Sequence, residues 1–176
     1  MRAPIKGALF YTFKMKHTFL LFILYSIGSF SQNLENIPSI FPIDSKEKFQ
    51  ITSDFGVRNH PIEKITKKHL GIDIAVQIGT YVYATANGCI ETSAYENGHG
   101  QTILISHDNN ITTRYSHLAL LFVSKGEEIK QGDIIGLVGS TGKSTGNHLH
   151  YEIRRNNTAI NPKPFLFLKY EKENGL

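Results

Sequence analysis

From Phe49 onward the chain consists of short β-rich runs separated by turn residues, and this pattern limits the fold more than any other feature. The runs are rich in Val, Ile, Thr and Tyr, which favour strands, and sustained helical periodicity is absent. We predict strands over residues 81–85, 89–94, 102–106, 111–115, 134–138 and 148–154. Residues 118–123 are the exception, where we expect one or two helical turns. The pattern predicts an all-β, mostly antiparallel domain.

Asparagine-rich turn sequences separate several of these runs. We predict turns at Asn87-Gly88, Glu96-Asn97-Gly98, Asp108-Asn109-Asn110 and Asn156-Asn157. The Asn-Gly dipeptide is a strong indication of a hairpin, because both residues adopt positive φ at little cost. We therefore expect Asn87-Gly88 to connect the runs on either side of it as a hairpin.

The chain divides into four predicted segments. Residues 1–31 have a basic start, a twelve-residue apolar run at 19–30 and small residues after it, as in a secretory signal peptide, with Met15 as an alternative start. The run is shorter than the roughly 20 residues that span a bilayer. Residues 32–48 form an arm or linker, 49–168 the domain and 169–176 a tail. We expect an exported protein, periplasmic or secreted, with an uncleaved N-terminal membrane anchor as the alternative.

The net charge of +4 does not indicate a nucleic-acid partner. The segment 1–31 holds four basic residues and no acidic one, so 15 basic and 15 acidic residues remain after it. Nucleic-acid binders instead carry clustered Lys and Arg. A nucleotide is not expected either: Gly142-Lys143-Ser144 resembles the end of a phosphate-binding loop, but the pattern needs glycine where Leu137 stands.

Two motifs that lie far apart in the chain supply candidate metal ligands. His148 and His150 alternate with apolar residues in a predicted strand, so they project to the same side. His69 and Asp73 bracket a glycine, and burial of the isoleucines on either side of Asp73 leaves its carboxylate on the other face. Two imidazoles, one carboxylate and an open position for water form the ligand set of a catalytic zinc ion.

The order and spacing of five motifs resemble those of the lysostaphin-type (LytM-like) zinc endopeptidases over residues 50–168. The motifs are ITSDFGVRNHP at 51–61, HLGIDIA at 69–75, TTRYSHL at 112–118, KGEEIKQGDIIGLVGSTGKSTGNHLHYEIR at 125–154 and Asn161-Pro162. The resemblance implies a duplicated-hybrid-motif β-sheet fold with a groove that holds the metal site. It also implies hydrolysis of peptide bonds in peptidoglycan stem peptides or cross-links.

The resemblance also implies roles for Asp73 and for four of the histidines in these motifs. His69, Asp73 and His150 match the zinc ligands, and His117 and His148 match two catalytic histidines that do not bind the metal. The chemistry needs such groups, because a base must take the proton of water and a donor must stabilise the oxyanion. Histidine is suited to this because it titrates near neutrality. Either His117 or His148 is the general base.

Three further residues have two readings each. Arg58 either binds a substrate carboxylate through paired hydrogen bonds or anchors its own loop. Glu152 shares a face with His150 by the period of two, and either orients its imidazole or is a surface charge. His99 lies in the turn Asn97-Gly98-His99-Gly100. It either faces the groove or points away from it, and we assign it no role.

The sequence supports two classes of function. The first is an exported zinc endopeptidase that acts on peptidoglycan peptides, with a divisome or envelope regulatory partner left unidentified. The second is a non-catalytic LytM-like binding module that activates another cell-wall hydrolase. The complete set of ligands and histidines favours the enzyme. Asn33 and Asn36 in the arm have the reach to block the zinc, but Ile37, Ile40 and Ile43 indicate an arm that packs against the sheet.

Overall fold

The structure is a computed structural model that describes residues 35–59 and 66–166. The predicted signal peptide (1–31), residues 60–65 and the predicted tail (169–176) lie outside the described residues. The chain divides into two units, 1–34 and 35–176, and the second unit holds every described residue. None of the helices formed by residues 35–59 and 66–166 is long and apolar enough to cross a membrane.

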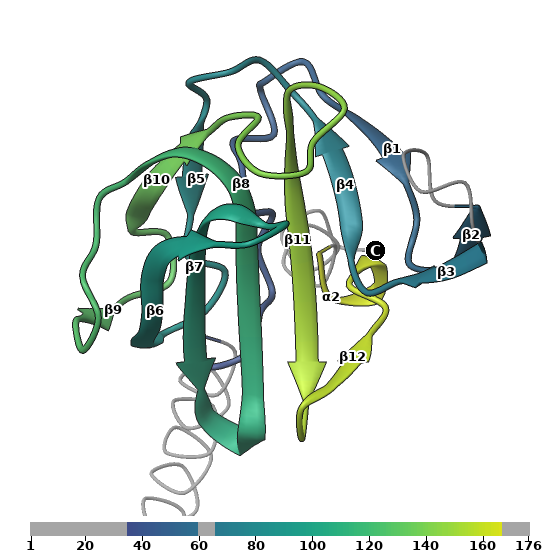
Figure 1. Cartoon of the computed structure of the whole chain (residues 1–176). Helices are drawn as coiled ribbons and strands as arrows, with labels where there is room; N and C mark the ends of the chain where they lie inside the picture. The colour runs from purple at the N-terminus through teal and green to yellow at the C-terminus, as the bar shows by residue number, and fades with distance from the viewer. Residues whose placement is uncertain (1–34, 60–65, 167–176) are drawn as a thin grey trace, which may run out of the picture. The chain divides into compact units, whose positions relative to one another are not determined.

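A ten-stranded antiparallel sheet dominates the second unit (Figure 1). Its strands are β1 (Gln50–Ser53), β4 (Ile72–Ala75), β5 (Tyr81–Tyr83), β6 (Gly88–Glu96), β7 (Gly100–His107), β8 (Ile111–Leu121), β9 (Glu128–Ile129), β10 (Ile134–Val138), β11 (His148–Arg155) and β12 (Thr158–Ile160). The order is β1-β4-β11-β8-β7-β6-β9, with β12 on β11 and with β10 between β8 and β5. A separate hairpin joins β2 (Gly56–Asn59) to β3 (Thr66–His69), and the helical turns are η1 (Asp108–Asn110) and α2 (Lys163–Leu166).

The predicted all-β class and the six predicted strands are confirmed, but two local predictions are wrong. Residues 118–121 continue strand β8 instead of turning into a helix, because Leu118 and Leu120 pair with β10. Asn87-Gly88 does not make a hairpin, since β5 pairs with β10 and β6 pairs with β7. The side chain of Asn87 instead accepts a hydrogen bond from the Gln131 backbone and donates one to Asn36.

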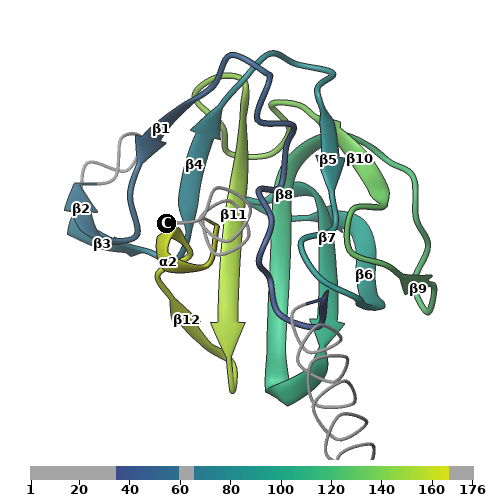
Figure 2. The same ribbon diagram turned by 180° about the vertical axis from the view of Figure 1, so that it is seen from behind.

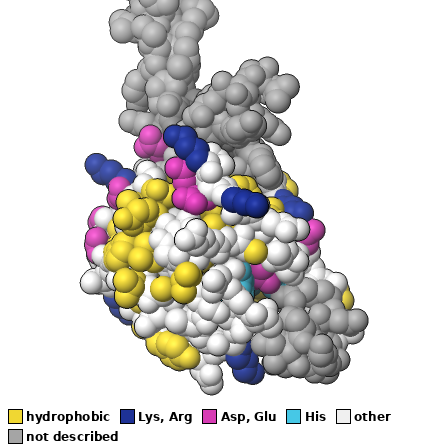
Figure 3. Space-filling model, turned by 90° about the horizontal axis from the view of Figure 1, so that it is seen from above, with side chains coloured by type: hydrophobic (Ala, Val, Ile, Leu, Met, Phe, Trp, Pro, Cys, Tyr) yellow, Lys and Arg dark blue, Asp and Glu magenta, His cyan; other side chains and the backbone are white. Residues whose placement is uncertain are grey.

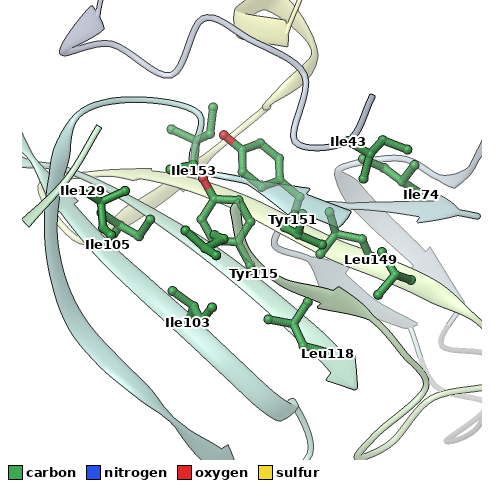
Figure 4. Packing of buried hydrophobic residues seen from close by; sticks show 14 of the residues in the cluster. Ile43, Ile74, Ile103, Ile105, Tyr115, Leu118, Ile129, Leu149, Tyr151 and Ile153 are labelled. Atoms are coloured by element: carbon green, nitrogen blue, oxygen red, sulfur yellow. The ribbon is translucent and has the colours of Figure 1, made fainter. Parts of the chain in front are cut away.

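The central strands have two faces with different chemistry. On β11, Leu149, Tyr151 and Ile153 are fully buried on one face and join the main hydrophobic cluster (Figure 4). His150 and Glu152 alternate with them and lie on the other face, which we call the site face. Tyr115 of β8 packs with Tyr151 on the apolar face, with ring centroids 5.3 Å apart. The same alternation thus builds a core behind the sheet and leaves polar groups in front of it.

The described part of the arm, residues 35–48, lies on the apolar side of the sheet. Ile43 is 2% exposed and belongs to the same hydrophobic cluster as Ile74. Figure 2 shows this dark-blue segment passing across the back of the sheet. The backbone carbonyl of Pro42 accepts a hydrogen bond from Tyr83, and the Asn36 amide donates to Asp108. Asn36 is therefore held by residues other than the candidate metal ligands, and Asn33 lies outside the described residues.

The pairing of β4 with β11 fixes which residues meet on the site face. Asp73 is directly opposite His150 in this antiparallel pair. The chain reaches β4 through Gly71, which runs so close to β11 that a Cβ atom there would lie 2.2 Å from the carbonyl oxygen of Tyr151. Gly71 therefore lets the segment between His69 and Asp73 pass against β11 without displacing it.

Replacement of Gly71 by alanine tests this close approach. We expect Gly71→Ala to lower the free energy of unfolding by about 1–3 kcal/mol, because the added methyl group overlaps a strand backbone that cannot move cheaply. The measurement is urea-induced unfolding of the purified protein. Gly146→Ala is the matched control, since nothing lies within 4 Å of a Cβ atom at that position. Equal stability of the two variants would contradict the steric argument.

Replacement of Ile43 tests whether the arm is part of the core. We expect Ile43→Ala to destabilise the fold by about 2–5 kcal/mol, the usual cost of truncating a buried isoleucine. Lys48→Ala changes an exposed arm residue and should leave the stability within about 0.5 kcal/mol of the parent. Thermal or chemical unfolding of both variants measures the difference. A loss below about 0.5 kcal/mol for Ile43→Ala would show that the arm merely rests on the surface.

Candidate metal centre

Three electron-rich atoms converge on the site face. Asp73 Oδ1 lies 2.8 Å from His150 Nδ1 and 3.1 Å from His69 Nε2, and the two imidazole nitrogens are 3.1 Å apart. The three residues come from the end of β3, from β4 and from β11. Figure 3 shows, on the face seen from above, only a small recessed area of histidine surface next to acidic side chains. The structure thus brings together the three residues that the sequence predicted as ligands.

Hydrogen bonds on the far side of each imidazole fix its tautomer. His69 Nδ1 lies 2.9 Å from the backbone carbonyl oxygen of Asp54, which can only accept, so Nδ1 carries the hydrogen. His150 Nε2 lies 3.0 Å from Glu152 Oε1 and donates to that carboxylate. In the neutral rings, the nitrogens that face Asp73 therefore keep their lone pairs. This is the arrangement by which metal-binding histidines are usually oriented.

The charges around the cluster favour a cation at its centre. Burial raises the pKa of Asp73, but hydrogen bonds and charge from His150 and His69 outweigh it, so the pKa lies far below its usual value. Burial also raises the pKa of Glu152, yet His150 and Arg154 bring it down to about 2. Burial lowers the pKa of His150, whereas Asp73 and Glu152 raise it and prevail. Two carboxylates thus stabilise positive charge on or beside this imidazole.

The donor set fits a metal ion of the zinc class. Two imidazole nitrogens and a carboxylate oxygen are common zinc ligands, and tetrahedral ligands about 2.0–2.2 Å from one ion lie about 3.3–3.6 Å from one another. The measured separations of 2.8–3.1 Å need only a small expansion to reach that spacing. Two lone pairs and an anionic oxygen at this distance repel one another unless a proton or a cation lies between them.

His117 reaches the same face through an irregularity in β8. Tyr115 lies in the apolar core, so strict alternation would place His117 in the core as well. Between Tyr115 and Leu118, however, β8 holds one more residue than its neighbour β7, which is a β-bulge. His117 adopts a left-handed backbone with φ 63° at this point, and its ring lies 4.7 Å from that of His148. The bulge turns the imidazole to the site face.

The loop between β10 and β11, residues 139–147, supplies a hydrogen-bond acceptor to each of the two predicted catalytic histidines. The carbonyl oxygen of Thr141 lies 2.7 Å from His117 Nδ1, and that of Gly146 lies 2.8 Å from His148 Nδ1. Both Nδ1 atoms therefore carry hydrogen, and in the neutral rings both Nε2 atoms keep a lone pair. His148 Nε2 is 3.8 Å from Asp73 Oδ1. Burial lowers the pKa of His117 to about 4, so this residue is neutral at pH 7.

The remaining predicted site residues have different outcomes. Glu152 is 1% exposed and contacts His150, which rules out the reading as a surface charge. The structure describes the backbone of Arg58, in β2, while the Arg58 side chain lies outside what is described. His99 lies on the site face, with its ring centroid 5.9 Å from that of His150. Arg114 lies on β8 opposite Glu152 and was not singled out from the sequence. The period of two, which places Arg114 on the same face as Ser116, was the available signal.

Comparisons with known proteins agree with this geometry. The model of "Peptidase family M23" matches residues 67–162. The peptidoglycan DD-endopeptidase ShyA of Vibrio cholerae is 41% identical over 114 residues, which are 64% of this chain and 26% of that protein. This chain therefore spans about a quarter of the length of that curated relative.

Solved peptidase structures are also similar to this chain. A zinc-containing peptidase from Vibrio cholerae superimposes with a TM-score of 0.65 at 36% identity and covers 70% of this chain and 38% of its own. The catalytic domain of lysostaphin from Staphylococcus simulans superimposes with a TM-score of 0.60 at 34% identity and covers 70% and 92%. The family model matches more than half of the residues of this chain, and the chain therefore belongs to peptidase family M23.

Proposed function

We propose that this chain is a zinc-dependent endopeptidase that hydrolyses peptide bonds in peptidoglycan stem peptides or cross-links. The observation that carries the proposal is the convergence of His69 Nε2, Asp73 Oδ1 and His150 Nδ1 within 3.1 Å of one another. Membership of the family and the name of the DD-endopeptidase relative support the substrate class. The likeness to the zinc-containing peptidase from Vibrio cholerae supports the choice of metal.

His69, Asp73 and His150 would hold the zinc ion, and the chain's other groups would orient them. A zinc ion, when bound, supplies Lewis acidity that polarises a peptide carbonyl and lowers the pKa of water. The Asp54 carbonyl and the Glu152 carboxylate keep the two imidazoles in the tautomer that presents a lone pair. The ligands are thus positioned before the metal binds.

His117 and His148 would handle the protons of the reaction. Each donates its Nδ1 hydrogen to a backbone carbonyl, which leaves Nε2 as the atom that exchanges a proton with water or substrate. His117 is neutral at pH 7 and can accept a proton at Nε2, as a general base must. His148 Nε2 lies 3.8 Å from Asp73 Oδ1, beside the cluster, where the imidazole would stabilise negative charge that develops on the substrate.

The proposed enzyme would act outside the cytoplasm. Peptidoglycan lies beyond the cytoplasmic membrane, so the proposal requires export, which residues 1–31 are expected to direct as a signal peptide. A non-catalytic module that activates another hydrolase would need neither the bulge that turns His117 nor the carbonyl that fixes its tautomer. The decisive test is digestion of purified peptidoglycan of defined cross-link chemistry, with products identified by mass spectrometry. No cleavage by the zinc-loaded protein would overturn the proposal.

Three alanine substitutions separate metal binding from proton transfer. We expect His150→Ala to lose both zinc and activity, because it removes a ligand. His117→Ala and His148→Ala should keep zinc and lose turnover by about 10²–10⁴-fold, the usual contribution of an acid or base. Elemental analysis measures zinc and the digestion assay measures turnover. His107→Gln, which lies away from the cluster against Asn87 and Thr113, is the control and should keep zinc. Loss of zinc from His117→Ala would contradict the assigned roles.

Glu152→Gln tests the hydrogen bond behind His150. The amide cannot supply the negative charge that raises the pKa of His150 and makes its Nδ1 a better ligand, so zinc affinity should fall by about 10–100-fold. Competition with a chromophoric chelator measures the affinity. Glu128→Gln, in the edge strand β9 where Glu128 is exposed, removes the same charge at a distance and should bind zinc like the parent. Equal affinities for the two variants would show that Glu152 does not tune the ligand.

A further inference from the structure

His99 is the one histidine on the site face whose ring makes no hydrogen bond, among the residues that the structure describes. It lies in the turn between β6 and β7, and its ring centroid is 5.9 Å from that of His150 and 6.5 Å from that of His117. Its backbone is fixed, because its carbonyl accepts a hydrogen bond from the His117 amide at 2.8 Å. Its ring nitrogens have no hydrogen-bond partner among residues 35–59 and 66–166. The imidazole is therefore available to a ligand beside the metal cluster.

Arg114 is a second donor with spare capacity on this face. Its side chain is 13% exposed, and Nη1 donates to Glu96. Nε is buried, lies 3.9 Å from Glu152 Oε2, and has no hydrogen-bond partner within the described part of the chain. Glu152 Oε2 does not satisfy it because 3.9 Å is beyond hydrogen-bond distance, whereas Arg154 Nε donates to that oxygen at 2.8 Å. The guanidinium is thus anchored at one edge and under-bonded at another, which is costly for a buried donor.

His99 and Arg114 flank the same carboxylate. A ring nitrogen of His99 lies within 4.8 Å of a Glu152 carboxylate oxygen, and Arg114 Nε lies 3.9 Å from Oε2. Glu152 accepts hydrogen bonds from His150 and Arg154, and neither His99 nor Arg114 makes a hydrogen bond to it in the described part of the chain. The pair therefore presents hydrogen-bond donors without an acceptor among the described residues, the His99 ring and Arg114 Nε, while Nη1 of the same guanidinium is paired with Glu96.

We propose that His99 and Arg114 form a carboxylate-binding subsite that takes a free carboxylate of the substrate peptide close to the scissile bond. This inference rests on the proposed function and narrows its substrate class. The unpaired Nε–H of the Arg114 guanidinium is complementary to a carboxylate oxygen, and such charge-assisted hydrogen bonds are about twice as strong as neutral ones. Only the His150 imidazole and the Glu152 carboxylate lie between the subsite and the metal-facing atom of His150. An extended peptide, at about 3.3 Å per residue, therefore spans the distance from the subsite to the metal cluster within about three residues.

Two matched peptides test the subsite with the zinc-loaded full chain. Both are synthetic cross-linked peptides with the same scissile bond, and the carboxyl group on the residue next to that bond is free in one and a carboxamide in the other. We expect kcat/KM to be about tenfold or more higher for the free acid, because the amide loses a charge-assisted bond. Arg114→Gln and His99→Ala should each move this ratio towards one. Arg114→Lys should keep part of the preference, since it keeps the charge but not the paired donors.

The ratio within each variant separates binding from structure. A residue that only supports the fold would lower both rates equally and leave the ratio unchanged. Lys125→Gln removes one positive charge from the exposed turn before β9 and should keep the parent ratio. If Arg114→Gln unfolds or loses zinc, His99→Ala decides, because the His99 ring makes no hydrogen bond in the described structure.

Each outcome bears on one level of the proposal. Equal cleavage of acid and amide by the parent protein, or an unchanged ratio in both His99→Ala and Arg114→Gln, would overturn the subsite and leave the endopeptidase proposal standing. Cleavage of neither peptide, together with intact peptidoglycan in the digestion assay, would overturn the proposed function and the subsite with it.

Discussion

The register between β4 and β11 is the constraint on which the rest of the site depends. Asp73 and His150 are opposite one another in this antiparallel pair, and every other contact of the cluster is arranged around them. A slip of β4 by one residue would turn Asp73 to the other face and bring Ile72 or Ile74 opposite His150 in its place. The hydrophobic core prevents this slip, because those isoleucines are fully buried among its members. The apolar face therefore holds the polar face in position.

Electrostatics sets a second condition, which is that the converging atoms need a positive charge between them. Around the cluster, each imidazole is held from behind by an acceptor, and the Glu152 carboxylate is in turn held by Arg154. Burying these charges costs free energy, which their mutual pairing offsets only while every partner is present. The site face is consequently a connected network in which the loss of one member leaves another buried and unpaired.

Much of this arrangement could be predicted because it follows the period of two. The alternation around His150 predicted a strand with both histidines on one side, and the alternation around Asp73 predicted a carboxylate opposite the buried isoleucines; the structure confirms both. His117 could be placed only by resemblance, since a bulge breaks the alternation that would have put it in the core. The prediction of a helical turn at residues 118–123 was wrong because β8 continues beyond this bulge and pairs with β10.

The residues that sequence reasoning missed or misread are those whose partners are distant in the chain. His99 belongs to the site because the turn between β6 and β7 places its ring 5.9 Å from that of His150, and Arg114 is notable because its buried Nε ends 3.9 Å from Glu152 without a hydrogen-bond partner in the described part of the chain. Asn87 looked like a turn residue, but its amide bonds with Asn36 and with the Gln131 backbone. Such choices among competing partners depend on the assembled fold.

The left-handed backbone of His117 has a consequence for how the site can fail. Strain of this kind costs about 1–3 kcal/mol and persists only where surrounding contacts enforce it. Here the enforcing contacts include the carbonyl of Thr141, in the loop that also fixes His148 through Gly146. The three candidate ligands, by contrast, stand at strand positions. Because loops open with smaller free energies than sheets, a transient opening of residues 139–147 would remove the hydrogen-bond acceptors of His117 and His148 together while the strands that carry the candidate ligands stayed paired. The candidate ligands and the other two histidines are thus held by segments of different stability.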